Sequence, residues 1–406
     1  MLAVETLSGN DIALRYDQGV TTLTDEQAAL RDAVRELADE RVAPRAADID
    51  SSGEFPWDVV ELLAQHDVLA LPFPAEHGGL GGEMLPVLLA IEELSRACAT
   101  SGLILAVQEL GSLALLHGGS AEQQQRWVPD LAAGKMLAAF ALTESGAGSD
   151  AASLRTRAER DGDDWLLNGE KRFISQGNVA GLVAVFAQTD GGTEAAKAKR
   201  HLTCFYVEKD TPGFSAPRIE HKMGIRGSPT AELAFDNARV PDANRVGEVG
   251  DGWKLAMKTF ERSRPGIAAQ AVGIAQGALD VATRYAAERR QFGKPIGEHQ
   301  MVSAMLADMA TRTEAARQLL WASAERIETG DPSAARWAAM CKLFAGDVAM
   351  EVTTDAVQVL GGYGYITEYP VERMMRDAKI TQLYEGTQQI QRLIIARDLL
   401  TAAESG

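Results

Sequence analysis

The sequence has few of the residues from which metal centres and disulfide frameworks are built. Its three cysteines, Cys98, Cys204 and Cys341, lie far apart, and none belongs to a Cys-x-x-Cys pair. Metal-binding and redox-pair functions therefore have no support, and we expect buried thiols in a reducing compartment, by default the cytoplasm. The six histidines form no His-x-x-x-His pair, so we predict no metal site.

Basic residues and long apolar runs are also scarce. Lys and Arg number 40 against 57 for Asp and Glu, which gives the 406-residue chain a formal net charge of -17. This balance disfavours nucleic acid as a partner. No run approaches the roughly 18 uninterrupted apolar residues of a membrane helix, and residues 1–20 carry acidic side chains. We therefore predict neither a membrane span nor a signal peptide.

The patterns that are present divide the chain into three stretches. After an extension over residues 1–20, residues 21–137 show helical periodicity, residues 138–249 show strand patterns, and residues 250–406 return to long helical runs. We predict an α+β multidomain fold with an N-terminal all-α domain, a middle antiparallel β domain and a C-terminal four-helix bundle.

Local signals place helices and turns within these stretches. Thr24 to Gln27 form a capping-box pattern, and the helix that follows should end at Pro44. Hairpin turns are expected at Asp161-Gly162 and Asn168-Gly169. Pro265 is expected to open a long helix with small inner residues. Further helices are expected at 57–69, 84–97, 102–117, 300–329, 333–360 and 386–403, and strands at 182–186 and 202–207.

Four segments combine residue types that suit a ligand, and two of them precede residue 300. Residues 140–150 place glycines and hydroxyls at a helix-to-strand boundary, where they suit a flavin ring or a phosphate, although an ordinary polar turn fits equally well. The Gly146-x-Gly148 spacing matches a dinucleotide fingerprint, but hairpin sequence follows where that fingerprint needs a helix. Residues 289–295 end a helix with arginines, which suit a pyrophosphate or simply the helix dipole.

The other two segments lie after residue 300, and Arg264 is a further candidate before them. Residues 358–365 contain three glycines that permit close approach to a flat ligand. Residues 384–389 contain Glu385, and a glutamate that opens a helix is usually a first-turn acid. Arg264 could reach an active site or remain a surface charge. The sequence contains no nucleophile elbow and no phosphate-binding Gly-Lys-Ser/Thr loop.

In this order along the chain, the segments resemble the acyl-CoA dehydrogenase family, of the medium- or short-chain type, over about residues 24–400. Several motifs in one order are far more specific than any single motif. The matching segments are the flavin loop (142–150), the end of the β domain (222–228 and 235–241), the Arg-x-x-Phe-Gly element (289–293) and the catalytic glutamate segment (384–387).

The resemblance implies an FAD-dependent enzyme that dehydrogenates an acyl-CoA to the trans-2-enoyl-CoA. Glu385 would abstract the α-proton, flavin N5 would accept the β-hydride, and an electron-transferring flavoprotein would receive the electrons. One FAD per subunit and a homotetramer, or at least a dimer, are implied. Some members hold the base at the position of Ser263, which cannot abstract a proton, and Glu261 nearby is a weak competitor for the role.

The resemblance also assigns individual positions to ligands. The implied cofactor-binding residues are Phe140, Leu142, Thr143, Gly148, Ser149, Phe173, Ser175, Arg289, Phe292, Gln300, Gln358, Gly361, Gly362, Thr387 and Gln389. The implied substrate-binding residues are Ser149, Glu261, Arg264, Tyr384 and Gly386. Among these, Arg289 and Phe292 would reach the FAD of a neighbouring subunit.

The sequence departs from the family pattern at two positions. Ser145 replaces the usual proline, which loosens the flavin loop by one fixed dihedral, and Phe173 replaces the usual tryptophan, which removes an indole N–H. Gln108 and Tyr365 hint at a short or polar acyl pocket.

Three alternative functions remain open. They are a dehydrogenase of acyl groups on a carrier protein, a flavin oxidase or monooxygenase, and a non-catalytic DNA-binding relative.

Overall fold

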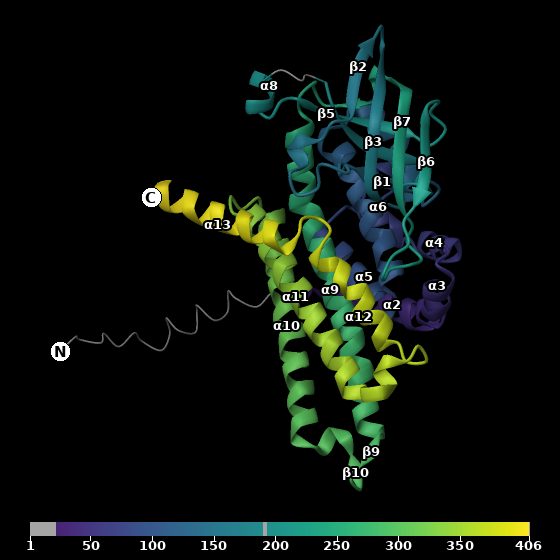
Figure 1. Ribbon diagram of the computed structural model, residues 1–406, viewed down its shortest axis with the longest axis vertical. Coiled ribbons are helices and arrows are strands. Elements are labelled where there is room, and N and C mark those ends of the chain that lie inside the picture. Colours follow the sequence, from purple (N-terminus) through teal and green to yellow (C-terminus); the bar gives the residue numbers. More distant parts are fainter. Residues whose placement is uncertain (1–21, 190–192, 406) are drawn as a thin grey trace, which may run out of the picture.

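The computed structural model describes residues 22–189 and 193–405 and contains the three predicted parts (Figure 1). The expected extension over residues 1–20 lies outside the described residues. The free cysteines are all buried, as predicted. The N-terminal helices are α2 (Asp25–Leu37), α3 (Ala46–Ser52), α4 (Trp57–Gln65), α5 (Met84–Ala97), α6 (Ala99–Gly118) and α7 (Ala121–Ala132).

The predicted capping box is confirmed, but the predicted end of its helix is wrong. The Thr24 hydroxyl accepts a hydrogen bond from the Gln27 backbone N–H at the start of α2. The chain does not leave helical geometry at Pro44, because a π-turn (Ala38–Val42) and a 3-10 turn (Ala43–Arg45) carry it into α3. Pro44 lies in the first turn of a new helical segment, where a backbone N–H would have no acceptor within the helix, so its absence costs no hydrogen bond.

One helix resembles a membrane span by composition. In the part of the chain that the structure describes, α6 alone is long and apolar enough to cross a membrane, and 89% of its apolar window is buried inside the fold. Its side chains contribute to the cores beneath the sheet and against α5 and α9. Burial of this kind is that of a core helix.

The middle part is one sheet with mostly antiparallel pairing. The strands are β1 (Ala138–Ala141), β2 (Arg157–Asp161), β3 (Asp164–Ser175), β4 (Leu182–Gln188), β5 (Leu202–Glu208), β6 (Phe214–Ile219), β7 (Thr230–Pro241) and β8 (Arg245–Val246). Their order is β6-β7-β3-β2-β4-β5-β8, with β1 paired in parallel to β4. A single parallel pairing also joins β2 to β4.

One of the two predicted hairpin turns is confirmed and the other is wrong. Asp161-Gly162 joins β2 to β3, whereas Asn168-Gly169 lies inside β3. The ladder between β3 and β7 changes register at Gly169, whose φ is 145°. A Cβ at this position would lie 2.7 Å from Thr156, so the glycine serves a bulge and close packing instead of a turn.

The C-terminal part is a bundle of long helices. Its helices are α9 (Gly252–Glu288), α10 (Gln300–Glu328), α11 (Ala334–Leu360), α12 (Val371–Ala378) and α13 (Gln388–Ser405). The short strands β9 (Arg290–Gln291) and β10 (Lys294–Pro295) form a hairpin at the end of the bundle far from the sheet (Figure 1). In the same view α9 runs from the sheet to this hairpin.

The prediction that Pro265 opens the long helix is wrong. α9 begins at Gly252, and Pro265 is buried inside it. The helix packs against α5, α6 and α11, and this burial offsets the hydrogen bond that the proline removes. Close approach is possible because α9 presents small residues: a Cβ at Gly273 would lie 2.2 Å from the Glu92 carbonyl oxygen of α5.

Candidate active site

A cavity of about 420 Å³ lies where the three parts of the fold meet. α6, the segment after β1, the end of β3, α9, the turn before α13 and α13 itself all contribute to its walls. The predicted site residues that line it are Phe140, Leu142, Thr143, Gly148, Ser149, Phe173, Ser175, Arg264, Tyr384, Glu385 and Gly386. Residues from the first and last thirds of the chain therefore share one site.

Glu385 reaches this cavity from an unusual backbone conformation. Its φ is 55° and that of Gly386 is 92°, so two successive residues lie in the left-handed region. Such a conformation costs a non-glycine residue about 1–3 kcal/mol and is concentrated at functional sites. Because α13 begins only at Gln388, Glu385 is not a first-turn acid of that helix.

The carboxylate of Glu385 is partly buried and bonded. The Ser263 hydroxyl of α9 donates a hydrogen bond to its Oε2 at 2.7 Å. Burial raises the pKa of Glu385 above its ordinary value, whereas the Ser263 hydrogen bond and the charges of Arg264 and Lys342 lower it, and the net direction is upward. A carboxylate with a raised pKa is better matched to proton abstraction near neutral pH.

Arg264 is held beside this turn. It is 7% exposed, and its guanidinium stands over the Phe260 ring at 5.3 Å. Its Nε lies 3.4 Å from the backbone carbonyl oxygen of Glu385. Phe260 packs in turn on Phe140, with ring centroids 5.5 Å apart. Arg264 is thus a buried cation of the cavity wall and not the surface charge that the sequence left open.

The segment after β1 is fixed by a buried ion pair. Lys171 donates to Oε1 of Glu144 at 2.7 Å, and the Thr156 backbone N–H donates to the same oxygen at 2.9 Å. Ser145 lacks the fixed dihedral of a proline, but its hydroxyl donates a hydrogen bond to Glu170 at 2.5 Å, which compensates for the expected flexibility of the loop. These bonds hold the backbone that presents the hydroxyl and glycine positions to the cavity.

Most of the remaining predicted cofactor residues form a second, distant group. Arg289 caps the C-terminus of α9, and its guanidinium lies 5.4 Å from the centre of the Tyr363 ring. Together with Gly361 and Gly362 it lines a separate cavity of about 510 Å³ beside the β9–β10 hairpin. Phe292 at the hairpin tip is 94% exposed, and Gln300 and Gln358 are exposed as well.

Some expected residues do not line the 420 Å³ cavity. Glu261, Thr387 and Gln389 are absent from its described walls, so Glu261 gains no support as a base. Gln108 is buried, and its side-chain amide donates to the Leu131 carbonyl at 2.8 Å. Tyr365 is 86% exposed. Neither of these last two residues lines the cavity, so the hint of a short or polar acyl pocket that depended on them gains no support.

Several wall residues were not anticipated from the sequence. Val107 and Leu110 of α6 supply an apolar wall, and α13 adds Ile390, Leu393, Ile394 and Arg397. The α13 positions have the three- and four-residue spacing of one helix face, a signal that was available in the sequence. Lys199 and Trp253 also line the cavity, with the ammonium 5.6 Å from the indole centre.

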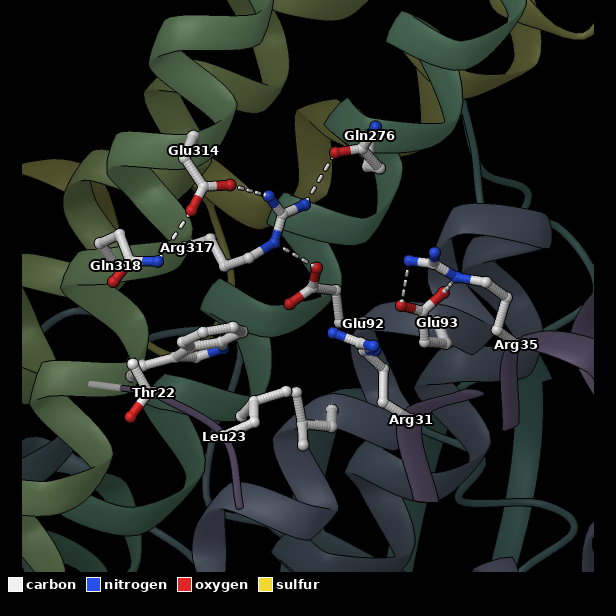
Figure 2. A pocket seen from close by; sticks show the side chains of 12 residues that line it. Thr22, Leu23, Arg31, Arg35, Glu92, Glu93, Gln276, Glu314, Arg317 and Gln318 are labelled. Atoms are coloured by element: carbon white, nitrogen blue, oxygen red, sulfur yellow. Dashed lines mark hydrogen bonds and ion pairs between the residues drawn. The ribbon is translucent and has the colours of Figure 1, made fainter. Parts of the chain in front are cut away.

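A cavity of about 590 Å³ where α2, α5, α9 and α10 meet is larger, but its chemistry is different (Figure 2). Arg317 of α10 donates to Glu92 of α5 at 2.7 Å, and Arg35 of α2 donates to Glu93 at 2.9 and 2.7 Å. Figure 2 shows these charged groups pointing toward one another. Paired charges across helices join the N-terminal part to the bundle, so we assign this cavity a structural role.

Comparison with known proteins agrees with this geometry. The family models of the acyl-CoA dehydrogenase N-terminal, middle and C-terminal domains match residues 24–135, 139–238 and 250–400. A probable acyl-CoA dehydrogenase of Mycobacterium tuberculosis is 48% identical over 93% of this chain and 96% of that protein. The acyl-CoA dehydrogenase of Bacillus subtilis is 46% identical over 93% of this chain and 99% of that protein.

A solved structure gives the same likeness in three dimensions. The butyryl-CoA dehydrogenase of Megasphaera elsdenii superposes with a TM-score of 0.90 and is 40% identical, covering 94% of this chain and 99% of that one. The likeness to this structure extends over nearly the whole chain, and the family-model matches include every residue that lines the 420 Å³ cavity.

Proposed function

The chain belongs to the acyl-CoA dehydrogenase family and is an oxidoreductase of that type, and we propose that it converts an acyl-CoA to the trans-2-enoyl-CoA with Glu385 as the base. The observation that carries this proposal is the position of Glu385. Its carboxylate is partly buried in the wall of a cavity of about 420 Å³, bonded by Ser263 and presented by a left-handed turn.

The residues around the cavity fit FAD, the cofactor on which the family depends. Thr143 and Ser175 bring hydroxyls to the cavity wall, and Phe140 and Phe173 bring aromatic faces. When bound there, FAD supplies the acceptor for the β-hydride. The backbone near Gly148 leaves space for a close approach, because a Cβ at that residue would meet nothing within 4 Å.

The position of the second group supports an oligomer in which FAD spans two subunits. Arg289, Gly361 and Gly362 lie near the hairpin at the far end of the bundle, away from the 420 Å³ cavity (Figure 1). A guanidinium suits a pyrophosphate. We therefore propose that each subunit binds the flavin end with its own cavity and the other end through a neighbour's Arg289 and Phe292, as part of a homotetramer.

The chain's own groups account for removal of the α-proton. The acidity of a thioester α-carbon must be increased by stabilising charge on the carbonyl oxygen, and a preorganised N–H donor does this. The Glu385 backbone N–H has no acceptor among the described residues, so it is free to donate to that oxygen. A substrate that fills the cavity displaces water from Glu385, which favours the neutral acid and thus proton uptake.

Charged side chains at the cavity suit the phosphates of the substrate's carrier. Lys199 and Arg397 are exposed and line the cavity, which places two cations beside it in a chain of net charge -17. The apolar residues Val107 and Leu110 suit the acyl group. We propose a short- or medium-chain acyl-CoA as substrate, an electron-transferring flavoprotein as acceptor near Phe173, and a cytoplasmic location.

A panel of acyl-CoA esters tests the proposal. The purified holoenzyme is mixed with each ester without oxygen, and loss of flavin absorbance near 450 nm is followed by stopped flow. At least one saturated acyl-CoA is expected to bleach the flavin, and the enoyl product is expected by mass spectrometry. If only acyl groups on a carrier protein bleach the flavin, the carrier-protein alternative replaces the proposal.

A further inference from the structure

Two fully buried side chains outside the cavity donate hydrogen bonds to the turn that carries Glu385. Gln391 of α13 donates from its amide to the Glu385 carbonyl at 3.0 Å and to the Gly386 carbonyl at 2.9 Å. Lys342 of α11 donates from Nζ to the same Gly386 carbonyl at 2.7 Å. Neither Lys342 nor Gln391 lines the cavity, and both are 0% exposed.

The ammonium of Lys342 also joins the turn to the start of α13. Nζ donates to Oε1 of Gln388 at 3.1 Å, and the Gln388 amide donates to the Leu343 carbonyl and to Asp347, both on α11. The turn and the first residue of α13 are thereby attached to one face of α11. A chain of bonds of this kind fixes an orientation better than a single contact does.

A buried lysine at this position is a costly way to make a structural contact. Burial lowers the pKa of Lys342 to about 7, although the charge of Glu385 acts in the opposite direction. The charged groups that face Lys342 are Glu385, Arg264 and Asp347. An apolar residue of similar length would avoid the desolvation cost but would leave the Gly386 carbonyl with one donor fewer.

Lys342 binds the turn at a point where a small displacement of the backbone would move the Glu385 carboxylate. The carbonyl that it binds belongs to Gly386, whose left-handed conformation sets the direction of the residue before it. Gln391 packs closely against this residue, because a Cβ at Gly386 would lie 2.7 Å from the Gln391 amide nitrogen. Misplacement of a catalytic group by about 1 Å can cost a factor on the order of 100 in rate.

We propose that Lys342 is a positioning residue for α-proton abstraction, which holds Glu385 toward the substrate by binding the Gly386 carbonyl from outside the cavity. This inference rests on the proposed role of Glu385 as the base. It assigns Lys342 no contact with substrate or cofactor.

The test compares K342M with wild type, E385Q and K379M as holoenzymes. K379M is a matched control, because Lys379 bonds Gln382 near the same turn but not the Gly386 carbonyl. K342M is expected to retain FAD and to reduce it about 100-fold more slowly at saturating acyl-CoA, with KM changed less than kcat. K379M is expected to match wild type. A K342M rate within a factor of about three of wild type overturns the inference.

A second measurement separates positioning from general damage. An acyl-CoA with sulfur in place of the β-methylene cannot release a hydride, but its α-proton can be removed, and the anion beside oxidised flavin gives a long-wavelength band. K342M should bind this analogue with nearly wild-type Kd and form little of the band. A weakened Kd with a full band overturns the inference.

A substitute variant and the wild-type result distinguish failure of this inference from failure of the proposed function. If K342M does not fold with FAD, Gln391→Leu removes the other donor to the same carbonyl and is subject to the same two results. If wild type itself neither bleaches nor ionises the analogue, the proposed function fails. If wild type is active and E385Q is inactive while a folded K342M is fast, only the inference about Lys342 fails.

Discussion

Removal of the Ser263 hydroxyl should shift the pH dependence of the enzyme in one direction. Ser263 donates to the Glu385 carboxylate at 2.7 Å and therefore stabilises its charged form. In Ser263→Ala this stabilisation is lost, so the pKa of Glu385, already raised by burial, rises further. A base must be deprotonated to act, so the acidic limb of the rate profile should move to higher pH.

The size of the shift follows from the energy of the hydrogen bond. A hydrogen bond to a charged group contributes about 1.5–3 kcal/mol, and one pKa unit corresponds to about 1.4 kcal/mol. A full loss would raise the pKa by about 1–2 units, and because Glu385 is only partly buried we expect about 1 unit.

Stopped-flow flavin reduction at saturating and at low acyl-CoA, between about pH 5 and 9, measures this shift. Ser263→Thr retains a hydroxyl and serves as the matched control, with a limb close to that of wild type. An S263A limb that stays in place, or that moves to lower pH, would show that Ser263 does not stabilise the carboxylate that limits the rate.

Three further predictions concern the framework around the site. Lys171→Met leaves the Glu144 carboxylate buried without its cation, so the free energy of unfolding in urea should fall by about 3–5 kcal/mol, and an unchanged midpoint would contradict this. Gly273→Ala places a methyl against the Glu92 carbonyl, so unfolding should become easier by about 1–3 kcal/mol, and equal stability would refute the close approach of α5 and α9. Arg289→Ala should lose FAD during gel filtration, seen as a lower ratio of 450 to 280 nm absorbance, while circular dichroism stays unchanged; full flavin retention would count against a role in pyrophosphate binding.

Sequence patterns predicted the elements that depend on local chemistry. The capping box of Thr24 and the turn at Asp161-Gly162 are correct because the bonds that define them join neighbouring residues. Patterns failed where tertiary packing prevails. Pro265 lies inside a helix because α9 is buried against α5, α6, α10 and α11. Gly169 lies inside a strand at a point where Thr156 leaves no room for a side chain.

The same division applies to the site. The segments around Thr143 and Glu385 could be recognised from residue order, and the structure brings both to one cavity. The contacts that fix Glu385 could not be recognised, because Ser263 lies 122 residues away in the chain and Lys342 binds the turn through a backbone carbonyl that carries no sequence signature. Long-range bonds to backbone atoms become visible only in three dimensions.

The most direct measurement of the central claim is the rate at which acyl-CoA reduces bound flavin in Glu385→Gln. The amide keeps nearly the size of the carboxylate and can still bond Ser263, so the variant should fold and retain FAD. Because glutamine cannot accept the α-proton, we predict a loss of roughly three decades or more, toward the upper end of general-base effects. Turnover near the wild-type rate, with flavin fully bound, would contradict the assignment of Glu385 as the base.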